Sequence, residues 1–143
     1  MAIKQLTIFV ENKKGALVSI TDTLAENNVN IRALSIAETE SFGILRLIVN
    51  NEEVAEKTLK DAGYLIKITD VVGVKIGDAP GKLTAALKVL NENEINIEYL
   101  YAFMARTEKH AYVVIRVEDN DRAEKVLENA GFHLITEADI SKL

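Results

Sequence analysis

The stretch AEKTLKDAGY at residues 55–64 returns as AEKVLENAGF at residues 123–132. Six of the ten positions are identical, and the last position keeps an aromatic ring. Each stretch predicts a helix that ends at its glycine, because glycine readily adopts the left-handed conformation that follows a helix. The distance between the two stretches exceeds the roughly 20–50 residues of a solenoid repeat. We therefore predict two copies of one small domain, at residues 1–70 and 71–143.

The repeat also holds upstream of these stretches. Gly-Ala-Leu at residues 15–17 corresponds to Gly-Lys-Leu at residues 81–83, and Val-Asn-Ile at residues 29–31 corresponds to Ile-Asn-Ile at residues 95–97. Strand-like alternation and helix-like spacing of apolar residues occur in the same order in both copies. The order is strand, helix, strand, strand, helix, strand. It predicts an α+β fold with two tandem ferredoxin-like βαββαβ domains, each an antiparallel sheet with its helices on one face.

The predicted elements of the two copies match one for one. In the first copy they are a strand at residues 6–10, a helix at 17–24, a strand from 29, a strand at 44–49, a helix at 55–62 and a strand at 65–68. In the second copy they are a strand at residues 72–76, a helix at 83–90, a strand from 95, a strand at 112–117, a helix at 123–130 and a strand at 134–136. The link at residues 69–72 contains no Gly, Pro or Ser, so we expect it to be short and stiff and to hold the two sheets in one fixed relation.

The sheet face away from the helices is predicted to be apolar. If alternate residues of the third strand of each copy face the core, the residues that face away are Ile44, Arg46 and Ile48 in the first copy and Tyr112, Val114 and Arg116 in the second. Neighbouring strands add Phe9 and either the row Tyr99, Tyr101 and Phe103 or the row Leu100 and Met104. A surface this apolar favours coverage by the other copy or by a second chain over use as a ligand platform. We therefore expect a homodimer.

Composition narrows the class of protein. The 143 residues are 48% hydrophobic and 27% charged, which is typical of globular proteins. The absence of cysteine excludes disulfides, thiol catalysis and thiolate metal sites. The net charge is −5 and neither copy has a basic cluster, so we expect no binding to nucleic acid or to a membrane surface. Without a signal peptide or a long apolar run, a cytoplasmic location is expected.

The turn GDAPGKL at residues 77–83 is the candidate ligand-binding segment of the second copy. Pro80 suits the first turn of a helix, where its missing N–H has no acceptor anyway. Gly81 lets another group approach the backbone. The helix start at Lys82 and Leu83 then offers unpaired amides, which can hold a carboxylate. Asp78 can cap those amides or accept the ammonium of the same ligand.

The first copy has a related turn, ENKKGAL at residues 11–17. Gly15, Ala16 and Leu17 correspond to the helix start, and Asn12 stands in the position of the aspartate. Lys14 replaces the proline, which predicts a looser turn. Taken alone, either turn is more typical of a plain helix cap than of a binding site.

Asn30 and Asn96 are the second residues of the next predicted strand in the two copies. Each is a candidate ligand contact, although capping of the preceding turn is the more common role of such a side chain. The two histidines, His110 and His133, have neither a carboxylate nor a serine at useful spacing. We interpret them as surface residues, and we predict no metal site.

The combination of these features resembles the ACT domain, a small ligand-binding module of amino-acid metabolism. The resemblance rests on DAPGKL at residues 78–83 with INI at 95–97, and on NKKGAL at residues 12–17 with VNI at 29–31. It covers nearly the whole chain, in the manner of stand-alone tandem ACT proteins. It implies domains that pair side by side into an eight-stranded sheet, with a free amino acid bound at the interface against the first strand-to-helix turn.

The sequence therefore predicts a non-catalytic, amino-acid-binding regulatory protein without a cofactor. The alternative is a ligand-free regulatory or scaffolding subunit that binds a partner enzyme of amino-acid metabolism. No phosphate loop, nucleophile elbow or metal-ligand spacing supports an enzyme. Acylphosphatases share the topology but need an arginine in the first turn, and RNA-binding domains of similar topology need more aromatic residues on the third strand.

Overall fold

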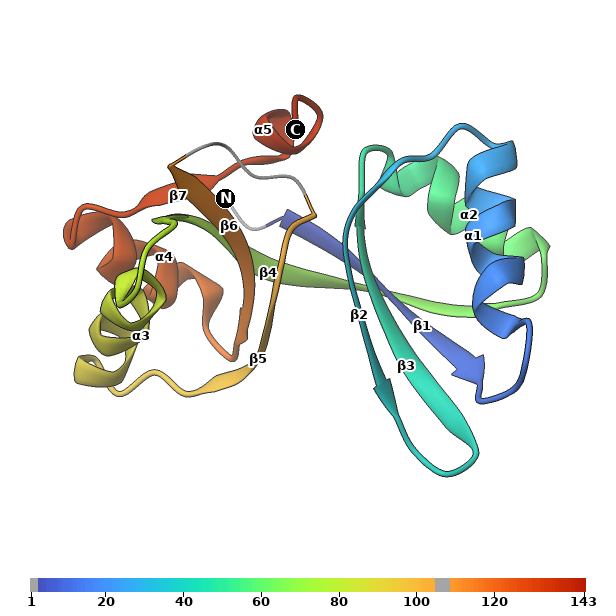
Figure 1. Cartoon of the computed structure of the whole chain (residues 1–143), viewed down its shortest axis with the longest axis horizontal. Coiled ribbons are helices and arrows are strands. Elements are labelled where there is room, and N and C mark those ends of the chain that lie inside the picture. Colours follow the sequence, from blue (N-terminus) through green and yellow to red (C-terminus); the bar gives the residue numbers. More distant parts are fainter. Residues whose placement is uncertain (1–2, 105–108) are drawn as a thin grey trace. The chain divides into compact units, whose positions relative to one another are not determined.

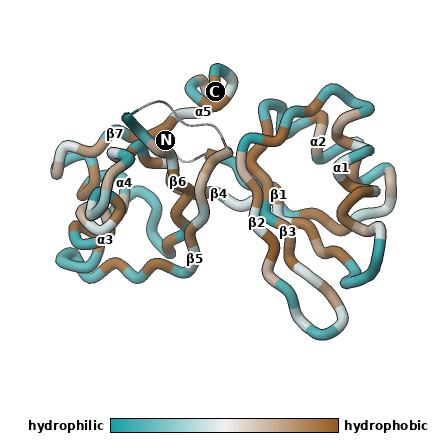
Figure 2. Tube along the Cα trace, in the orientation of Figure 1, coloured by the Kyte–Doolittle hydropathy of each residue, from teal (hydrophilic) through white to brown (hydrophobic). Residues whose placement is uncertain are grey.

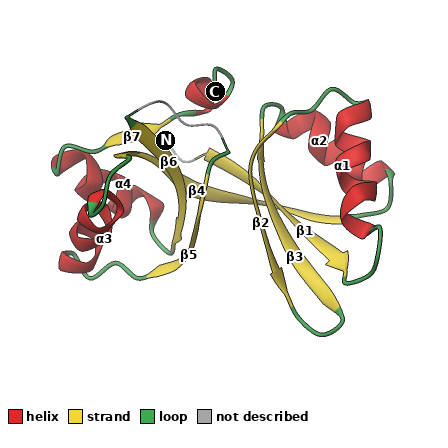
Figure 3. Cartoon of the chain, in the orientation of Figure 1, coloured by secondary structure: helices red, strands yellow, loops and turns green. Residues whose placement is uncertain are grey.

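The computed structural model describes residues 3–104 and 109–143, which form two compact units (Figure 1). One unit is Lys4–Thr69, and the other is Asp70–Leu143 together with Ile3. Both units follow the order strand, helix, strand, strand, helix, strand (Figure 3). The predicted α+β fold with two βαββαβ copies is confirmed.

The first unit contains β1 (Ile3–Glu11), α1 (Ala16–Glu26), β2 (Ile31–Glu38), β3 (Phe42–Val49), α2 (Glu52–Asp61) and the start of β4 (Leu65–Gly77). Its strands lie in the order β2-β3-β1-β4, and β3 pairs antiparallel with both β1 and β2. This order leaves β2 at one edge of the sheet. The two helices lie together beside the sheet (Figure 3).

The second unit contains the rest of β4, followed by α3 (Lys82–Glu92), β5 (Ile97–Ala102), β6 (His110–Val117), α4 (Asn120–Asn129), β7 (His133–Ile135) and α5 (Glu137–Ile140). Its strands lie in the order β5-β6-β4-β7, and every pair is antiparallel. Strand by strand this is the order of the first unit. The repeat in sequence is thus a repeat in topology.

Two elements differ from the sequence-based expectation. The predicted strands on either side of residues 69–72 are one continuous strand, β4, because nothing in that stretch removes a backbone donor or favours a turn. The helix α5 has no counterpart in the first unit and is too short to show a helical period. A capping box holds its start: the Asp139 amide donates to the Thr136 hydroxyl at 3.2 Å, and the Thr136 amide donates to the Asp139 carboxylate at 2.9 Å.

Each unit has its own hydrophobic core between its sheet and its helices. In the first unit Ile20 and Leu24 of α1 and Leu59 of α2 are fully buried against Leu45 and Leu47 of β3. Figure 2 shows the matching hydrophobic stretches along β1 and β3. The prediction that alternate residues of β3 face the core is confirmed. Full burial of one such side chain contributes about 1.5–3 kcal/mol.

The core of the second unit is built from the corresponding positions. Leu90 of α3 and Leu127 of α4 are fully buried against Val74 of β4 and Ile115 of β6. Asp119 caps α4 by accepting a hydrogen bond from the Arg122 amide at 3.1 Å. The spacing that predicted helices at these positions is therefore the spacing of core residues.

Strand register decides which row of β5 faces away from the helices. Leu100 pairs with Ile115, which belongs to the core, whereas Tyr101 pairs with Val114 on the other face. Because paired residues of antiparallel strands point to the same side, the tyrosine row lies on the helix-free face. Tyr101 and Val114 are buried there, as is Ile48 on the corresponding face of the first unit.

We expect Leu127→Ala to lower the free energy of unfolding by about 2–5 kcal/mol, since it leaves a cavity in a closed core. Leu59→Ala should have an effect of similar size in the first unit. Urea unfolding followed by circular dichroism measures both. Leu65→Ala is the control, because that side chain is 70% exposed, and its effect should stay within about 0.5 kcal/mol. Equal losses in all three variants would contradict this assignment of the cores.

Candidate ligand-binding site

The strand-to-helix turns of the two units have the same backbone geometry. Gly15 and Gly81 are the N-cap residues of α1 and α3, with φ values of 85° and 87° and a ψ of −9° in both. This is the left-handed region, which only glycine occupies without strain. The two turns therefore share one backbone conformation although Lys14 stands in place of Pro80, and the looser first turn stays a prediction. The glycine, which both copies share, determines the turn.

Both helix starts leave backbone donors available. Neither Gly15 nor Gly81 is accompanied by a side-chain cap hydrogen bond. The Lys82 amide donates to the Ala79 carbonyl at 3.1 Å, so it is used within the turn. The amides of Leu83 and Thr84 lie in the first helical turn, where no intrahelical acceptor exists. Leu83 was predicted for this role, whereas Thr84 was not.

Asp78 is the acidic residue of the turn that precedes α3. Its backbone amide donates to the Lys109 carbonyl at 2.9 Å, and its side chain is exposed beside the turn. The capping role that the sequence allowed for Asp78 stays a prediction. Its other predicted role, as a partner for a ligand ammonium, also stays a prediction.

In the first unit, a cavity of about 390 Å³ lies against the turn between β1 and α1. It brings together three of the predicted residues, Asn12, Ala16 and Leu17, with Ile36 and Glu38 from the end of β2. The remaining lining residues are Val10, Glu11, Lys13 and Gly43. A cavity of this size is within the range of small-molecule sites. Sequence reasoning missed Ile36 and Glu38 because they are separated from the turn by a helix and a strand.

Gly15 lines a neighbouring hollow of about 440 Å³ on the other side of the turn. There the Tyr64 hydroxyl donates to the Ser19 hydroxyl at 2.7 Å. Lys13 lines both hollows and pairs with Glu11 at 3.1 Å. The first turn of α1 therefore separates two concave surfaces, and the predicted residues divide between them.

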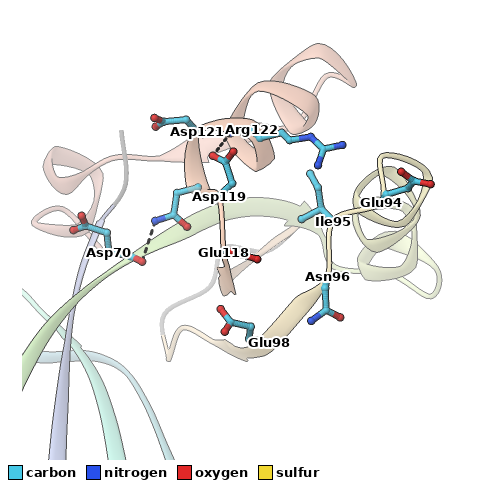
Figure 4. A pocket seen from close by; sticks show the side chains of 10 residues that line it. Asp70, Glu94, Ile95, Asn96, Glu98, Glu118, Asp119, Asp121 and Arg122 are labelled. Atoms are coloured by element: carbon cyan, nitrogen blue, oxygen red, sulfur yellow. Dashed lines mark hydrogen bonds between the residues drawn. The ribbon is translucent and has the colours of Figure 1, made fainter.

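In the second unit a cavity of about 860 Å³ lies elsewhere, around the start of β5 and of α4 (Figure 4). Carboxylates dominate its lining, which consists of Asp70, Glu94, Ile95, Asn96, Glu98, Glu118, Asp119, Asn120, Asp121 and Arg122. The Asn120 side chain donates to the Asp70 carbonyl at 3.0 Å, and Arg122 donates to the Asn93 carbonyl. So much negative charge disfavours a ligand carboxylate. Of the predicted residues, only Asn96 is found here.

Asn30 and Asn96 lie far from the turns of their own units. In the second unit Gly77 pairs with His110, whereas Ile97, next to Asn96, pairs with Val117 at the other end of β6. At about 3.3 Å per residue the two ends of that strand are roughly 23 Å apart. Within one unit these asparagines therefore cannot reach a ligand at the turn.

Residues other than Asn30 and Asn96 cap the turns that precede β2 and β5. The side chains of Asn27 and Asn93 donate to the carbonyls of Thr23 and Val89, each at 2.8 Å, and so close the ends of α1 and α3. The backbone of Asn30 is held instead by Asn50, whose side chain accepts from the Asn30 amide at 2.9 Å.

Metal sites, buried histidines and membrane-spanning helices are further features that could indicate a function in the described part of the chain. Among residues 3–104 and 109–143, no group of three or more histidine, aspartate or glutamate side chains is placed to hold a metal ion. His133 is exposed and His110 is half-buried. No helix within the described ranges is both long and apolar enough to cross a bilayer.

The comparisons with known proteins identify the family. The family model described as an ACT domain pair matches residues 1–143. A crystal structure of a protein from Bacteroides thetaiotaomicron is 42% identical, with a TM-score of 0.93, and the match covers 100% of this chain and 98% of that one. The chain therefore belongs to the ACT domain pair family. This family assignment supports a regulatory, ligand-sensing role.

More distant structures show the same fold. The regulatory subunit of aspartate kinase from Thermus thermophilus, in its ligand-free form, matches with a TM-score of 0.67 at 17% identity, over 91% of this chain and 93% of that one. The corresponding subunit from Thermus flavus matches with a TM-score of 0.62 at 15% identity, over the same shares. A search of curated proteins gave no match.

We expect Gly15→Ala and Gly81→Ala to destabilise the chain equally, by about 1–2 kcal/mol each, because both turns need the same left-handed residue. An added Cβ would meet no atom within 4 Å at either position, so the loss would be backbone strain alone. Thermal unfolding of the two variants measures this. A clearly smaller loss for Gly15→Ala would show that the turn without proline relaxes.

Proposed function

We propose that this chain is a non-catalytic regulatory protein that senses a free amino acid at an ACT domain interface. The observation that carries the proposal is the cavity of the first unit, which has unpaired helix amides on one side and the Glu38 carboxylate on the other. Amides at a helix start suit the α-carboxylate of an amino acid, and a carboxylate suits its ammonium. The predicted domains, residues 1–70 and 71–143, each offer one such turn.

The ligand would lie against the first turn of α1, between Leu17 and the end of β2. The amides of Leu17 and Val18 have no intrahelical acceptor, and they would hold the carboxylate. Glu38 is the better partner for the ammonium, since Glu11 already pairs with Lys13 at 3.1 Å. Ile36 and Leu17 would contact the ligand side chain.

The second unit would use its own turn in the same way. There the amides of Gly81, Leu83 and Thr84 would receive the carboxylate, and Asp78 or a nearby carbonyl would receive the ammonium. Pro80 and Lys82 would shape the turn rather than contact the ligand, because Lys82 has already used its amide. The first unit is the stronger candidate, since its cavity includes an acidic side chain from β2 as well as the turn.

A homodimer would complete the site. β2 is an edge strand, and it exposes Leu34 and Ile36, which are 37% and 52% accessible. Antiparallel pairing with the β2 strand of a second chain would cover these side chains and satisfy the free edge. It would also bring Asn30 of one chain, at the start of β2, beside the turn at Asn12 of the other. Side-by-side pairing of β2 would therefore let Asn30 reach a ligand at the turn of the second chain, although it cannot reach the turn of its own unit.

Binding at such an interface gives regulation without catalysis. A ligand that contacts both sides of a joint stabilises only the joined state, so ligand concentration sets the population of that state. A partner enzyme of amino-acid metabolism that binds only the joined state would then respond to the ligand concentration. A cytoplasmic location fits this role and a sequence without cysteine.

We expect isothermal titration against the twenty amino acids to identify a ligand that is recovered unaltered. Glu38→Gln should weaken its binding about ten- to hundredfold, because a charge-assisted hydrogen bond is worth about 1.5–3 kcal/mol. Glu40→Gln, the same change at another exposed glutamate two residues away, should leave binding within about twofold. If no amino acid binds, the chain is a ligand-free regulatory or scaffolding subunit. If Glu38→Gln binds like the parent protein, the site lies elsewhere.

We expect Ile36→Lys to convert the dimer into a monomer, because it places a charge in the centre of the proposed edge contact. Sedimentation equilibrium at micromolar concentration measures the change. Leu65→Lys alters an exposed leucine on the helix-free face, and the dimer should survive it. Loss of the dimer in Leu65→Lys alone would move the interface to that face.

A further inference from the structure

A second cavity of the second unit has a different character from the ligand site and from the acidic cavity. It has a volume of about 210 Å³ and lies where β4, β6 and β7 meet the C-terminal segment. Lys75, Tyr112 and His133 line it from the three strands, and Lys142 lines it from the residues after α5. Its other lining residues are Ile135, Asp139 and Leu143. Cationic and hydroxyl groups from four separate segments thus share one small space.

Strand register places the three strand residues in one row. Lys75 pairs with Tyr112 on β6 and with His133 on β7, so all three point to the same face of the sheet. Lys75 and Tyr112 are half-buried there. Ile135 forms the apolar floor and is 2% exposed. The donors therefore stand on rigid strands rather than on loops.

Asp139 is the acidic side chain in the lining, and its carboxylate is already engaged. Its Oδ2 accepts a hydrogen bond from the Thr136 amide at 2.9 Å within the capping box of α5. This backbone hydrogen bond is the main reason that the pKa of Asp139 is lowered, and the nearby charges of His133 and Lys142 act in the same direction against partial burial. The carboxylate holds α5 in place and keeps its charge, so it offsets one of the two lysine charges and leaves the other uncompensated within the lining.

The first unit has an apolar cluster at the same place. Phe9, Ile44 and Leu65 occupy the positions that correspond to Lys75, Tyr112 and His133. All three positions, on three different strands, thus carry hydrogen-bonding groups in one copy and hydrocarbon in the other. The segment that supplies the second lysine follows α5, which only the second unit has. Replacement of the whole set together is the pattern expected of a site that one copy has and the other lacks.

We propose that this cavity, formed by Lys75, Tyr112, His133 and Lys142, binds a small dianion of the phosphate class. The two ammonium groups outweigh the single Asp139 carboxylate, and the tyrosine hydroxyl and the imidazole donate to the oxygens of the dianion. The small volume and the apolar floor exclude a large anion. The site is separate from the amino-acid site, which lies at a strand-to-helix turn and has no part in this cavity.

Titration of the full chain with inorganic phosphate, followed through the imidazole NMR signals of His133, tests the proposal. We expect a saturable shift at millimolar or lower phosphate. Lys75→Met keeps the aliphatic chain and removes the charge, and it should weaken binding at least about tenfold. Lys88→Met is the matched control, because it makes the same charge change at an exposed position of α3 and should leave binding unchanged. A shift that does not saturate, or equal effects of the two lysine variants, would overturn the proposal.

Measuring both phosphate binding and thermal stability in a second variant separates a loss of binding from a loss of folding. Tyr112→Phe preserves the ring and its contact with Phe103, and it should weaken phosphate binding severalfold without a change in thermal stability. Unchanged phosphate binding in this variant would contradict the role given to the hydroxyl. Glycerol phosphate, titrated in parallel, distinguishes a phosphomonoester from inorganic phosphate as the ligand. Tighter binding than inorganic phosphate assigns the site to a phosphomonoester. Weaker binding assigns it to the free ion.

Discussion

Burial of one face of each sheet beneath two helices is the interaction on which the rest of the structure depends. A domain of this size has little apolar surface to spare, so both helices and the central strands must contribute to one core. Leu24 and Leu59 in the first unit, and Leu90 and Leu127 in the second, supply it. Once one face is committed to the core, the edge strand and the helix-free face remain as surfaces for other contacts.

The two copies keep the core and differ on those remaining surfaces. Glu98 and Asp119 of the acidic cavity correspond to Arg32 and Asn51 of the first copy, so the charge of that region changes while the strands beneath it do not. Changes of this kind cost little stability because exposed side chains have few packed neighbours. A duplicated fold can therefore place different binding surfaces on the same framework.

The strand-to-helix turn connects the core with the site. Its left-handed glycine reverses the chain sharply, so that α1 can cover the sheet while its first amides stay open. An ordinary side-chain cap would stabilise the helix start and would occupy those amides. Neither Gly15 nor Gly81 is accompanied by such a cap, and the open amides are the feature that a ligand carboxylate can use.

The sequence by itself determined the repeat, the order of helices and strands, the residues of each core and the glycines of the turns, since strand and helix periods are local properties of the chain. Only the tertiary structure decided which distant segments meet. Register placed Asn30 and Asn96 at the far end of the sheet from the turns, turned the row of Tyr101 away from the helices, and brought Glu38 beside α1. Such neighbours depend on pairing between strands far apart in sequence, and no local pattern records that pairing.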